Sequence, residues 1–474
     1  MSLNLNQTLS WTKALAASTP DAAAELAMLN DLQGNILKGH GRHHTSNLFI
    51  AFDPKKQAAA KKFVAEFARE VTSALDQLTQ TQVFKASGVH GDTFVAFMLS
   101  ATGYHALGQS VAKPHGDAFN AGMKARGLND PAPSQWETYF SSEVHAMILV
   151  AAGSPDERKV ERDAIAARIA ATAGAVKLLN PGFKEDGDAL FNSDGNGIEH
   201  FGYVDGRSQP LALQEDLHKE EHHNGGISNW NPAIPLSQLL VPCPGGKLAA
   251  SHGSYFVFRK LDQNVKAFKA QEKALGEQLE KRHGLPQDSI GERAGASVVG
   301  RFENGTPVTL SQTEISPIPP GAIGVPNNFN YASDSAGLKC PFAGHIRKTN
   351  PRNDTQDSKD HLMARRGIPY GERSTDNQQT DGVGLLFMAY QSSLENQFEF
   401  TQQAWANNSN FRIGGTGIDP VIGQPKVPTG QKWPVVYGKT LSDGRDEDDF
   451  SGFVTMRGGE YFFAPSISFL KSLR

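Results

Sequence analysis

NLFIAFD, residues 47–53, is the stretch of sequence from which the fold can be built outward. Its run of apolar residues, with aromatic and β-branched side chains among them, predicts a strand. Residues 54–78 follow, and in them Phe63, Phe67 and Val71 recur at a four-residue interval. That interval places the three side chains on one face of a helix. Together the two segments predict a strand followed by a long amphipathic helix.

The same rhythm of strands and helices continues along the chain. The further expected strands are residues 93–101, 144–152, 255–261, 298–301 and 384–391, and the further expected helices are 155–178, 265–282 and 394–406. Because 474 residues exceed what one core usually serves, we expect two α+β halves of similar size. The predicted organisation is a loosely attached N-terminal arm at 1–30, a first domain at 31–224 and a second at 225–474, connected through the Gly- and Pro-rich segment 225–246.

Composition narrows the classes of partner. Lys and Arg total 46 against 50 Asp and Glu, a net charge of −4, so the sequence favours neither nucleic acid nor an anionic membrane as a partner. No run of about 18 apolar residues occurs that could span a bilayer. Only two cysteines are present, which favours a reducing compartment. We therefore expect a cytoplasmic protein that acts on small molecules.

Residues 316–380 are rich in Pro, Gly, Asn, Asp and Arg and predict long loops, which are often functional. Within them, CPFAGHIRKTNPR at 340–352 holds His345 among small and apolar residues. A neutral imidazole in such surroundings is a good axial ligand for haem iron. Arg347, Lys348 and Arg352 would then suit the carboxylates of a porphyrin. A core histidine beside an arginine-rich loop is the alternative, and spacing alone does not exclude it.

Two further segments carry candidate catalytic groups. Asp205 precedes a glycine in FGYVDGRSQP at 201–210, and Arg365 precedes a Gly and a Pro in MARRGIPYG at 363–371. Cleavage of a bound peroxide needs a group that moves a proton from the inner to the outer oxygen, and positive charge for the departing hydroxide. A carboxylate and an arginine meet those needs. Taken alone, such segments are more often a tight turn and a solvated pair of arginines.

Other chemical signals are weaker. The segment 192–203 opens like a calcium loop but has Tyr203 where a bidentate Glu is needed. The pairs His43–His44 and His222–His223 lack partners at metal-site spacing, which indicates surface histidines. The context of Cys340 favours a free buried thiol over a thiolate ligand. The sequence contains no nucleophile elbow, phosphate loop or dinucleotide fingerprint.

Seven separated segments, in this order, resemble the dye-decolourising (DyP-type) haem peroxidases. The resemblance runs from about residue 31 to the end of the chain. Any one segment could arise by chance, but seven in family order are specific. They are LQGNILKGHGR (32–42), GYVDG (202–206), CPFAGHIRKTNPR (340–352), RRGIPYG (365–371), GLLFMAYQ (384–391), GTGIDPVIG (415–423) and FVTMRGGEYFFAPS (453–466).

The resemblance assigns roles to individual residues. It implies that His345 is the iron ligand, that Asp205 is the distal acid and base, and that Arg365 is the distal cation. It also implies that Arg352 pairs with a haem propionate. Asp419 is implied to accept the Nδ1–H of His345, which would raise the basicity of the ligand.

Three more residues belong to the implied site. Leu385 and Phe387 alternate along a strand, so both point to one face and would roof the distal pocket. The resemblance also implies that bulky donors are oxidised through aromatic residues at the surface, because they cannot reach buried haem. Trp405 is the candidate surface electron relay, with a plain core or interface tryptophan as the alternative.

For the whole protein, the resemblance implies an α+β fold of two ferredoxin-like domains, each an antiparallel sheet covered by helices, with haem held mainly by the C-terminal domain. The implied cofactor is one haem b (iron protoporphyrin IX) per chain. Hydrogen peroxide and small-molecule donors such as anthraquinone dyes and phenolics are the implied partners, oxidised through a ferryl intermediate with an acidic optimum. A homo-oligomer is compatible with the sequence. Two alternatives stay open: a haem-binding or haem-delivery protein, and a structural member of the fold without ligand.

Overall fold

The structure, a computed structural model, describes residues 3–109, 116–223, 225–316, 324–355, 357–424, 430–439 and 445–473, without the side chains of 445–447. Asn224, which closes the predicted first domain, and parts of the predicted loop region 316–380 lie outside these ranges. No helix within them is long and apolar enough to cross a membrane.

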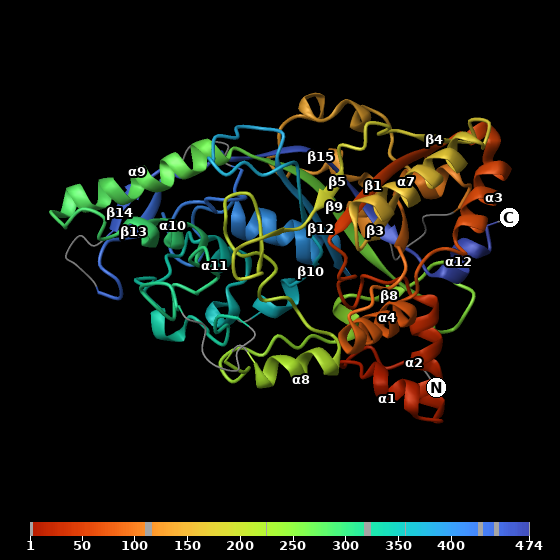
Figure 1. Cartoon of the computed structure of the whole chain (residues 1–474), viewed down its shortest axis with the longest axis horizontal. Helices are drawn as coiled ribbons and strands as arrows, with labels where there is room; N and C mark the ends of the chain where they lie inside the picture. The colour runs from red at the N-terminus through yellow and green to blue at the C-terminus, as the bar shows by residue number, and fades with distance from the viewer. Residues whose placement is uncertain are drawn as a thin grey trace.

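One antiparallel sheet runs through the middle of the molecule (Figure 1). Its main path has the order β10, β12, β9, β15, β2, β3, β1, β4, with β11 beside β12, β5 beside β1 and β8 beside β9. The halves of the chain meet where Phe463 of β15 pairs with Leu99 of β2. The strands are β1 (His44–Phe52), β2 (Phe94–Leu99), β3 (Ala146–Ala152), β4 (Val176–Leu178), β5 (Asp186–Asp188), β8 (Val241–Pro242), β9 (His252–Gln263), β10 (Ala364–Arg365), β11 (Ile368–Tyr370), β12 (Gly384–Gln391) and β15 (Val454–Ala464); β6 (Leu190–Phe191) pairs with β7 (Gly197–Ile198) and β13 (Gln431–Pro434) with β14 (Arg445–Asp448) outside it.

Helices of the first half gather at one end of the sheet, and α9 to α11 lie at the other end (Figure 1). Two consecutive π-helical segments, η9 (Leu394–Glu399) and η10 (Thr401–Ala406), occupy the place of the helix predicted at 394–406. The α-helices are α1 (Trp11–Ala16), α2 (Pro20–Asp31), α3 (Gln57–Phe67), α4 (Ala74–Ser87), α5 (Ala101–Ala106), α6 (Gly116–Ala121), α7 (Pro155–Ala170), α8 (Gln214–His222), α9 (Val265–His283), α10 (Gly291–Val299), α11 (His345–Thr349) and α12 (Ile467–Lys471). Short 3₁₀ turns are η1 (Pro54–Lys56), η2 (Met123–Ala125), η3 (Pro133–Gln135), η4 (Thr138–Ser141), η5 (Leu236–Gln238), η6 (Ala332–Asp334), η7 (Arg352–Asp354) and η8 (Ser358–His361).

The long helix predicted at 54–78 is wrong, because two helices replace it. The break lies between α3 and α4, where the backbone N–H of Thr72 donates to Val95 O of β2 at 2.9 Å. The Thr72 hydroxyl in turn accepts from the Val95 N–H at 3.1 Å. Ser73 then caps the second helix by accepting from the Asp76 N–H. Pairing of Thr72 with β2 therefore competes successfully with helix continuation.

Two other expectations fail for local reasons. The helix predicted at 155–178 ends at Ala170, and the chain turns at 173–174 in left-handed conformations before it enters β4. Of residues 298–301, predicted as a strand, the first two instead complete α10, which closes on Gly300 at φ +95°. A Cβ at Gly300 would lie only 2.3 Å from Ile346 Cγ1, so this glycine lets α11 pack closely against α10.

The N-terminal segment is not loosely attached. Trp11 is 6% exposed and Met28 is fully buried, so both belong to the main core. The backbone of Leu9 also exchanges hydrogen bonds of 2.9 and 2.8 Å with Ala212 and Gln214. The apolar side chains of the predicted arm thus find partners in distant parts of the chain.

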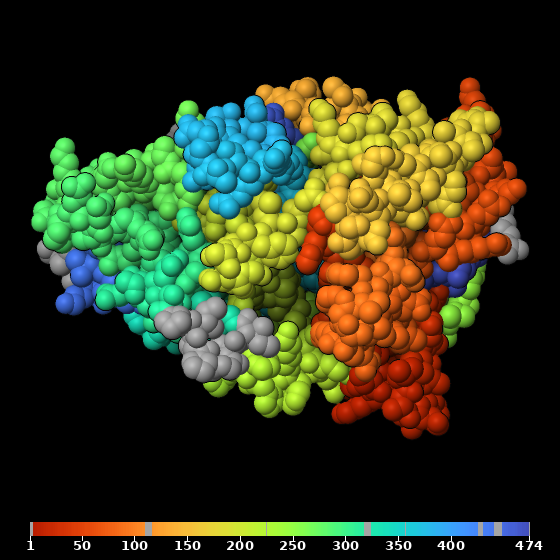
Figure 2. All heavy atoms as spheres, viewed as in Figure 1, coloured from red at the N-terminus to blue at the C-terminus, as the bar shows by residue number. Residues whose placement is uncertain are grey.

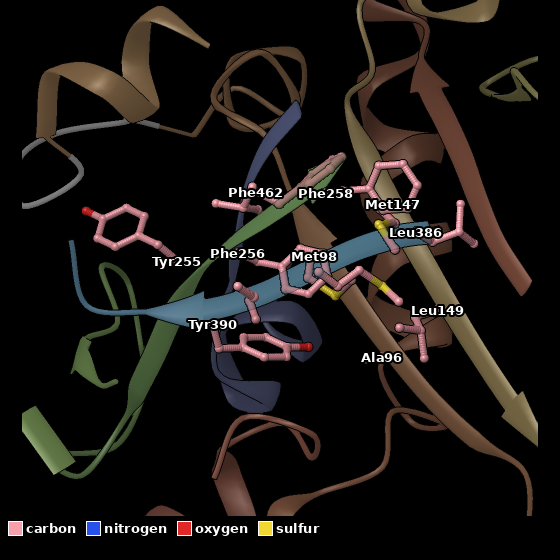
Figure 3. Close-up of a cluster of buried hydrophobic side chains, with 14 of the residues drawn as sticks. Ala96, Met98, Met147, Leu149, Tyr255, Phe256, Phe258, Leu386, Tyr390 and Phe462 are labelled. Atoms are coloured by element: carbon pink, nitrogen blue, oxygen red, sulfur yellow. The ribbon is translucent and has the colours of Figure 1, made fainter. Parts of the chain in front are cut away.

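The core follows the faces of the sheet, and both halves of the chain contribute to it. Figure 3 shows Met98 of β2 and Met147 of β3 beside Phe256 of β9 and Leu386 of β12. All four side chains have no exposed surface. Burying a side chain of this size stabilises a fold by roughly 1.5–3 kcal/mol. The two halves therefore share one core and hold each other in place.

Candidate active site

A cavity of about 350 Å³ is bounded by β9, β12, α11, η10 and the loop 199–210. Six of the eight residues that the sequence singles out line it. The other two, Asp419 and Trp405, lie behind its wall, and each touches an element that lines it. The six lining residues are Asp205, His345, Arg352, Arg365, Leu385 and Phe387.

His345 begins α11 and is fixed by a carboxylate. Its Nδ1–H donates to Asp419 Oδ2 at 2.9 Å, which leaves Nε2 as the nitrogen with a free lone pair. Asp419 is fully buried, and its Oδ1 accepts from the N–H groups of Val421 and Ile422 at 2.8 and 2.9 Å. Three hydrogen bonds therefore hold the carboxylate that orients the imidazole.

Electrostatics agree with this arrangement. Burial alone would lower the pKa of His345, but the charge of Asp419 and its hydrogen bond outweigh burial and raise that pKa. Burial likewise works to raise the pKa of Asp419, yet His345 and the backbone N–H groups lower it on balance. The pKa of His345 also responds to the charges of Arg365 and Asp205, so both groups lie within electrostatic reach of the imidazole.

Asp205 reaches the cavity because its loop turns the neighbouring aromatic residues inward. Phe201 stacks on Phe268 of α9, with ring centroids 3.9 Å apart. Glu199 holds the turn by accepting from the N–H groups of Phe201 and Tyr203 at 2.8 and 3.0 Å. Asp205 itself stays exposed at the cavity, its Oδ1 accepting from the Gly206 N–H at 2.6 Å. An exposed carboxylate can exchange protons with water and with a bound molecule.

Arg365 and Arg366, adjacent in sequence, point to different places. Arg365 lies on β10, lines the cavity and donates from Nη2 to Arg207 O at 2.7 Å. Arg366 instead donates from Nε to Asn35 O at 2.7 Å and from Nη2 to Ile36 O at 3.0 Å. Arg366 therefore fastens the N-terminal LQGNILKG segment, and Arg365 is the guanidinium available to a bound molecule.

Further cations surround the same cavity without partners of opposite charge. Arg301 and Arg352 are almost fully buried, and each donates from Nη2 to Ser208 Oγ and to Asn327 Oδ1 at 2.8–3.1 Å. Burial and the neighbouring arginines lower the pKa of Arg301 well below its usual value. Five arginines line the cavity, and one of them, Arg259, forms an ion pair with Asp130. Within the described ranges, no carboxylate forms an ion pair with the other four, Arg207, Arg301, Arg352 and Arg365. An anionic ligand would offset this concentration of charge.

Two cations expected near the candidate iron ligand His345 bind partners outside the cavity. Arg347 is fully buried and forms ion pairs with Asp334 and Asp354 at 3.0 and 2.7 Å. Lys348 donates to Trp405 O at 3.0 Å and to Asn408 O at 2.6 Å. Neither lines the cavity, so the expectation that both face a porphyrin carboxylate is wrong. Buried partners outside the cavity therefore bind both cations.

The wall opposite the loops is apolar. Leu385 and Phe387 of β12 line the cavity, while Leu386 and Met388 between and after them are buried on the other face of the sheet. This alternation follows from the period of two along a strand. Leu385 pairs with Leu261 of β9, which lines the cavity as well.

Trp405 does not lie at the surface. Its side chain is 5% exposed and packs edge-on against His361 and Phe400, with ring centroids 5.0 and 5.3 Å apart. His361 stacks on Phe400 at 3.7 Å and lines the cavity. The surface position expected for Trp405 is therefore wrong, because the π-helical turn directs the indole inward.

Comparisons with known proteins agree with this site. Residues 31–181 match the family model described as the DyP dimeric alpha+beta barrel domain, and residues 225–412 match the model of the Dyp-type peroxidase C-terminal region. The multifunctional dye peroxidase DyP2 of Amycolatopsis sp. is 42% identical over the full length of both chains. The chain belongs to the DyP-type peroxidase family. The dye-decolorizing peroxidase msp1 of Mycetinis scorodonius is 30% identical, with 94% of this chain and 87% of the relative covered.

Solved structures of DyP-type peroxidases share the fold. The Anabaena sp. enzyme superposes with a TM-score of 0.88 at 39% identity, with 99% of each chain covered. Amycolatopsis DyP2 gives 0.87 at 41% identity, with 99% of this chain and all of the other covered. The expected α+β fold of two ferredoxin-like domains is thus confirmed, and the chain is a haem-dependent, peroxide-using oxidoreductase.

Sequence reasoning missed part of this DyP-type site. Arg207 and Ser208 directly follow the GYVDG segment, yet nothing in their local pattern predicts a role in the cavity wall. Arg301 was expected on a strand, and Asn327 lay in a loop region without further assignment. Arg301 reaches the cavity because α10 ends at Gly300, and Asn327 holds it from behind the wall by accepting a hydrogen bond from its guanidinium.

Proposed function

We propose that this DyP-type peroxidase binds one haem b per chain through His345 and reduces hydrogen peroxide with Asp205 and Arg365, oxidising bulky dyes and phenolics. The observation that carries the proposal is the convergence of three groups on one cavity. They are an imidazole backed by a buried carboxylate, an exposed carboxylate and a guanidinium.

The residues present fit haem b. Haem requires a nitrogen ligand, apolar walls for its flat macrocycle and cations for its two propionates. His345 offers the nitrogen, Leu385 and Phe387 offer apolar surface, and the arginines of the wall other than Arg259 carry uncompensated charge. When bound, the group supplies the iron centre at which peroxide is activated. Arg301 and Arg352, with Ser208 and Asn327 between them, would bind the propionates.

Asp205 and Arg365 have different roles in peroxide cleavage: Asp205 transfers a proton, and Arg365 stabilises negative charge. The Asp205 carboxylate accepts the proton of the inner peroxide oxygen and returns it to the outer oxygen, which then leaves as water. Arg365 holds a permanent positive charge where negative charge develops on the departing oxygen. Its hydrogen bond to Arg207 O keeps the guanidinium in place before peroxide arrives, so little reorganisation is needed.

Asp419 acts through His345. Its hydrogen bond fixes the imidazole tautomer and the direction of Nε2, and its negative charge makes that nitrogen a stronger electron donor. Burial raises the pKa of Asp419, but the charge and hydrogen bond of His345, helped by the two backbone N–H groups on Oδ1, lower that pKa on balance. Asp419 is therefore a positioning residue.

Bulky donors need a route for electrons through the protein, because a cavity of about 350 Å³ that holds a cofactor leaves no room for a dye. Trp405 is the proposed relay, although its side chain is almost fully buried. His361 and Phe400 connect it to the cavity wall, and Lys348 connects its backbone to the ligand helix. Small donors, by contrast, can react at the cavity itself.

The proposal is tested with Asp205→Asn, Arg365→Leu and His345→Ala in the haem-loaded enzyme. Loss of a general acid–base group or of preorganised charge typically costs about 10²–10³-fold in rate. We expect losses of that order in anthraquinone turnover for the first two variants. For His345→Ala we expect loss of the native Soret spectrum. Unchanged turnover in all three variants would reject the assignment of roles.

The same variants separate the enzyme from a mere haem carrier. A carrier needs His345 and the propionate-binding arginines but gains nothing from Asp205. If Asp205→Asn binds haem normally and loses peroxide-driven turnover, Asp205 serves catalysis. If haem dissociates readily from the wild type and turnover does not depend on Asp205, the carrier is the better interpretation.

A further inference from the structure

One helix outside the haem cavity brings together side chains that bind metals. α8 carries His218, Glu221 and His222, all of them exposed. One ligand atom from each lies within 4.8 Å of the other two. Residues three and four positions apart share a face of a helix, so this convergence follows from the backbone and does not depend on loop geometry. Residues 218–222 form the pattern His-x-x-Glu-His, so the expectation that His222 lacks partners at metal-site spacing is wrong.

The two imidazoles already lie close together. Their ring centroids are 4.3 Å apart, and the planes are inclined by 52°. A His218 ring nitrogen, Nδ1, lies 3.9 Å from Glu221 Oε2. Two nitrogens bound to one zinc ion at 2.0–2.1 Å are about 3.3 Å apart in tetrahedral geometry. Small rotations of three exposed side chains would therefore close the site.

One histidine is held in the tautomer that a metal requires. His222 Nδ1 lies 2.7 Å from the backbone carbonyl of His218, and because a carbonyl only accepts, Nδ1 carries the proton. Nε2 of His222 consequently bears the lone pair. A metal-bound histidine nearly always donates its other N–H to a carboxylate or a carbonyl in this way. This hydrogen bond is an observation independent of the clustering.

The helix that carries the cluster is anchored, so ordering the site costs little backbone entropy. Ser10 and Thr12 donate to Glu215 of α8 at 2.8 and 2.7 Å, and Lys38 pairs with Asp216. In Figure 1, α8 lies on the lower rim of the molecule, and Figure 2 shows its side chains on the open surface below a hollow. A cation can therefore reach the cluster from solvent.

We propose that α8 binds a divalent transition metal of borderline softness, Zn²⁺ or Cu²⁺, through His218, His222 and Glu221. Two imidazole nitrogens and one carboxylate oxygen suit these ions, whereas Mg²⁺ and Ca²⁺ prefer oxygen ligands alone. Three protein ligands leave at least one coordination position for water or for a group on another molecule. The site is separate from the haem chemistry, so its failure would leave the proposed function intact.

The experiment uses the untagged, haem-loaded protein after treatment with EDTA. Zn²⁺ binding is measured by equilibrium dialysis with metal analysis, for the wild type and for His218→Ala, His222→Ala and Glu221→Gln. His105→Ala, which removes another exposed histidine near the end of a helix, is the matched control. Alanine favours helix, so the variants of α8 should keep the fold, and circular dichroism verifies this.

We expect one Zn²⁺ site in the wild type and in His105→Ala. Loss of one ligand should weaken binding by about tenfold or more, since even the loss of an outer partner of a metal ligand costs 10–100-fold. The Cu²⁺ form should show two nitrogen couplings in its electron paramagnetic resonance spectrum, and His218→Ala should show one. Zn²⁺ affinity equal in the wild type and in both histidine variants, or no saturable binding at all, would overturn the proposal.

Discussion

Replacing Asp419 by Asn should weaken haem binding more than replacing it by Ala, although Asn is the closer mimic. In the wild type, Asp419 Oδ1 accepts from two backbone N–H groups and Oδ2 accepts from His345 Nδ1 at 2.9 Å. An Asn side chain has one oxygen, and the two backbone donors at Val421 and Ile422 will keep it. The NH₂ group then faces His345 Nδ1, which must become an acceptor. The proton moves to Nε2, and the nitrogen that should bind iron loses its lone pair.

The magnitude follows from what each variant removes. Loss of the outer partner of a metal-bound histidine costs about 10–100-fold in affinity, or roughly 1.4–2.8 kcal/mol. Asp419→Ala loses the partner but leaves His345 free to adopt either tautomer, so we expect an effect near tenfold. Asp419→Asn also enforces the wrong tautomer, so we expect 100-fold or more. For folding stability the order should reverse, with Asp419→Ala less stable than Asp419→Asn. The Ala variant leaves two buried backbone N–H groups without acceptors, and each costs about 1–3 kcal/mol.

Two measurements on the same samples test whether the two variants rank in opposite order for haem affinity and for folding stability. Haem affinity is obtained by titrating the apo-protein with haemin and following the Soret band, and stability by urea unfolding of the apo-protein. The wild type sets the reference in both. If Asp419→Asn binds haem as tightly as Asp419→Ala, or if the two variants rank the same way in affinity and stability, the tautomer argument is refuted.

Three further predictions concern stability, pH and electron transfer. Gly300→Ala should destabilise the protein by about 2–5 kcal/mol, from positive φ and the collision with Ile346, whereas Gly127→Ala, which meets open space, should be nearly neutral in a thermal melt. Burial, partly opposed by hydrogen bonds from Phe201, Gln263 and Tyr203, raises the pKa of Glu199 from 4.5 to about 7. The folded state therefore binds the extra proton, and its stability should fall by about 3 kcal/mol as the pH rises from 4.5 to 7 and then level off. Urea unfolding at pH 5 and pH 8 should show a smaller loss in Glu199→Gln, and an equal loss would contradict the assignment. Trp405→Phe should reduce turnover of an anthraquinone dye but leave turnover of a small phenol unchanged, and parallel loss of both would point to damage of the haem site.

Periodicity predicted much of the framework, and its failures have a common cause. The strands at 47–53 and 384–391 were found because alternation and apolar runs are local properties of a strand. Local periodicity predicts one continuous helix at 54–78. It does not show the break near Thr72, because that break depends on a hydrogen bond to Val95, which is distant in sequence. The same holds for 298–301, where Ile346 requires a glycine at 300 and so ends the helix.

Some features of the candidate site could likewise be predicted from local sequence, whereas others depend on distant contacts. His345, Asp205 and Arg365 were named from short segments whose order along the chain carries the family resemblance, and Leu385 and Phe387 from the period of a strand. The inward position of Trp405, the commitment of Arg347 and Lys348 to buried partners and the membership of Arg301 in the cavity wall were beyond that reasoning. The sequence by itself determined which chemical groups this protein possesses and which segments carry them. Only the tertiary structure decided which of the cations face the cavity, because those choices depend on partners far apart in the chain.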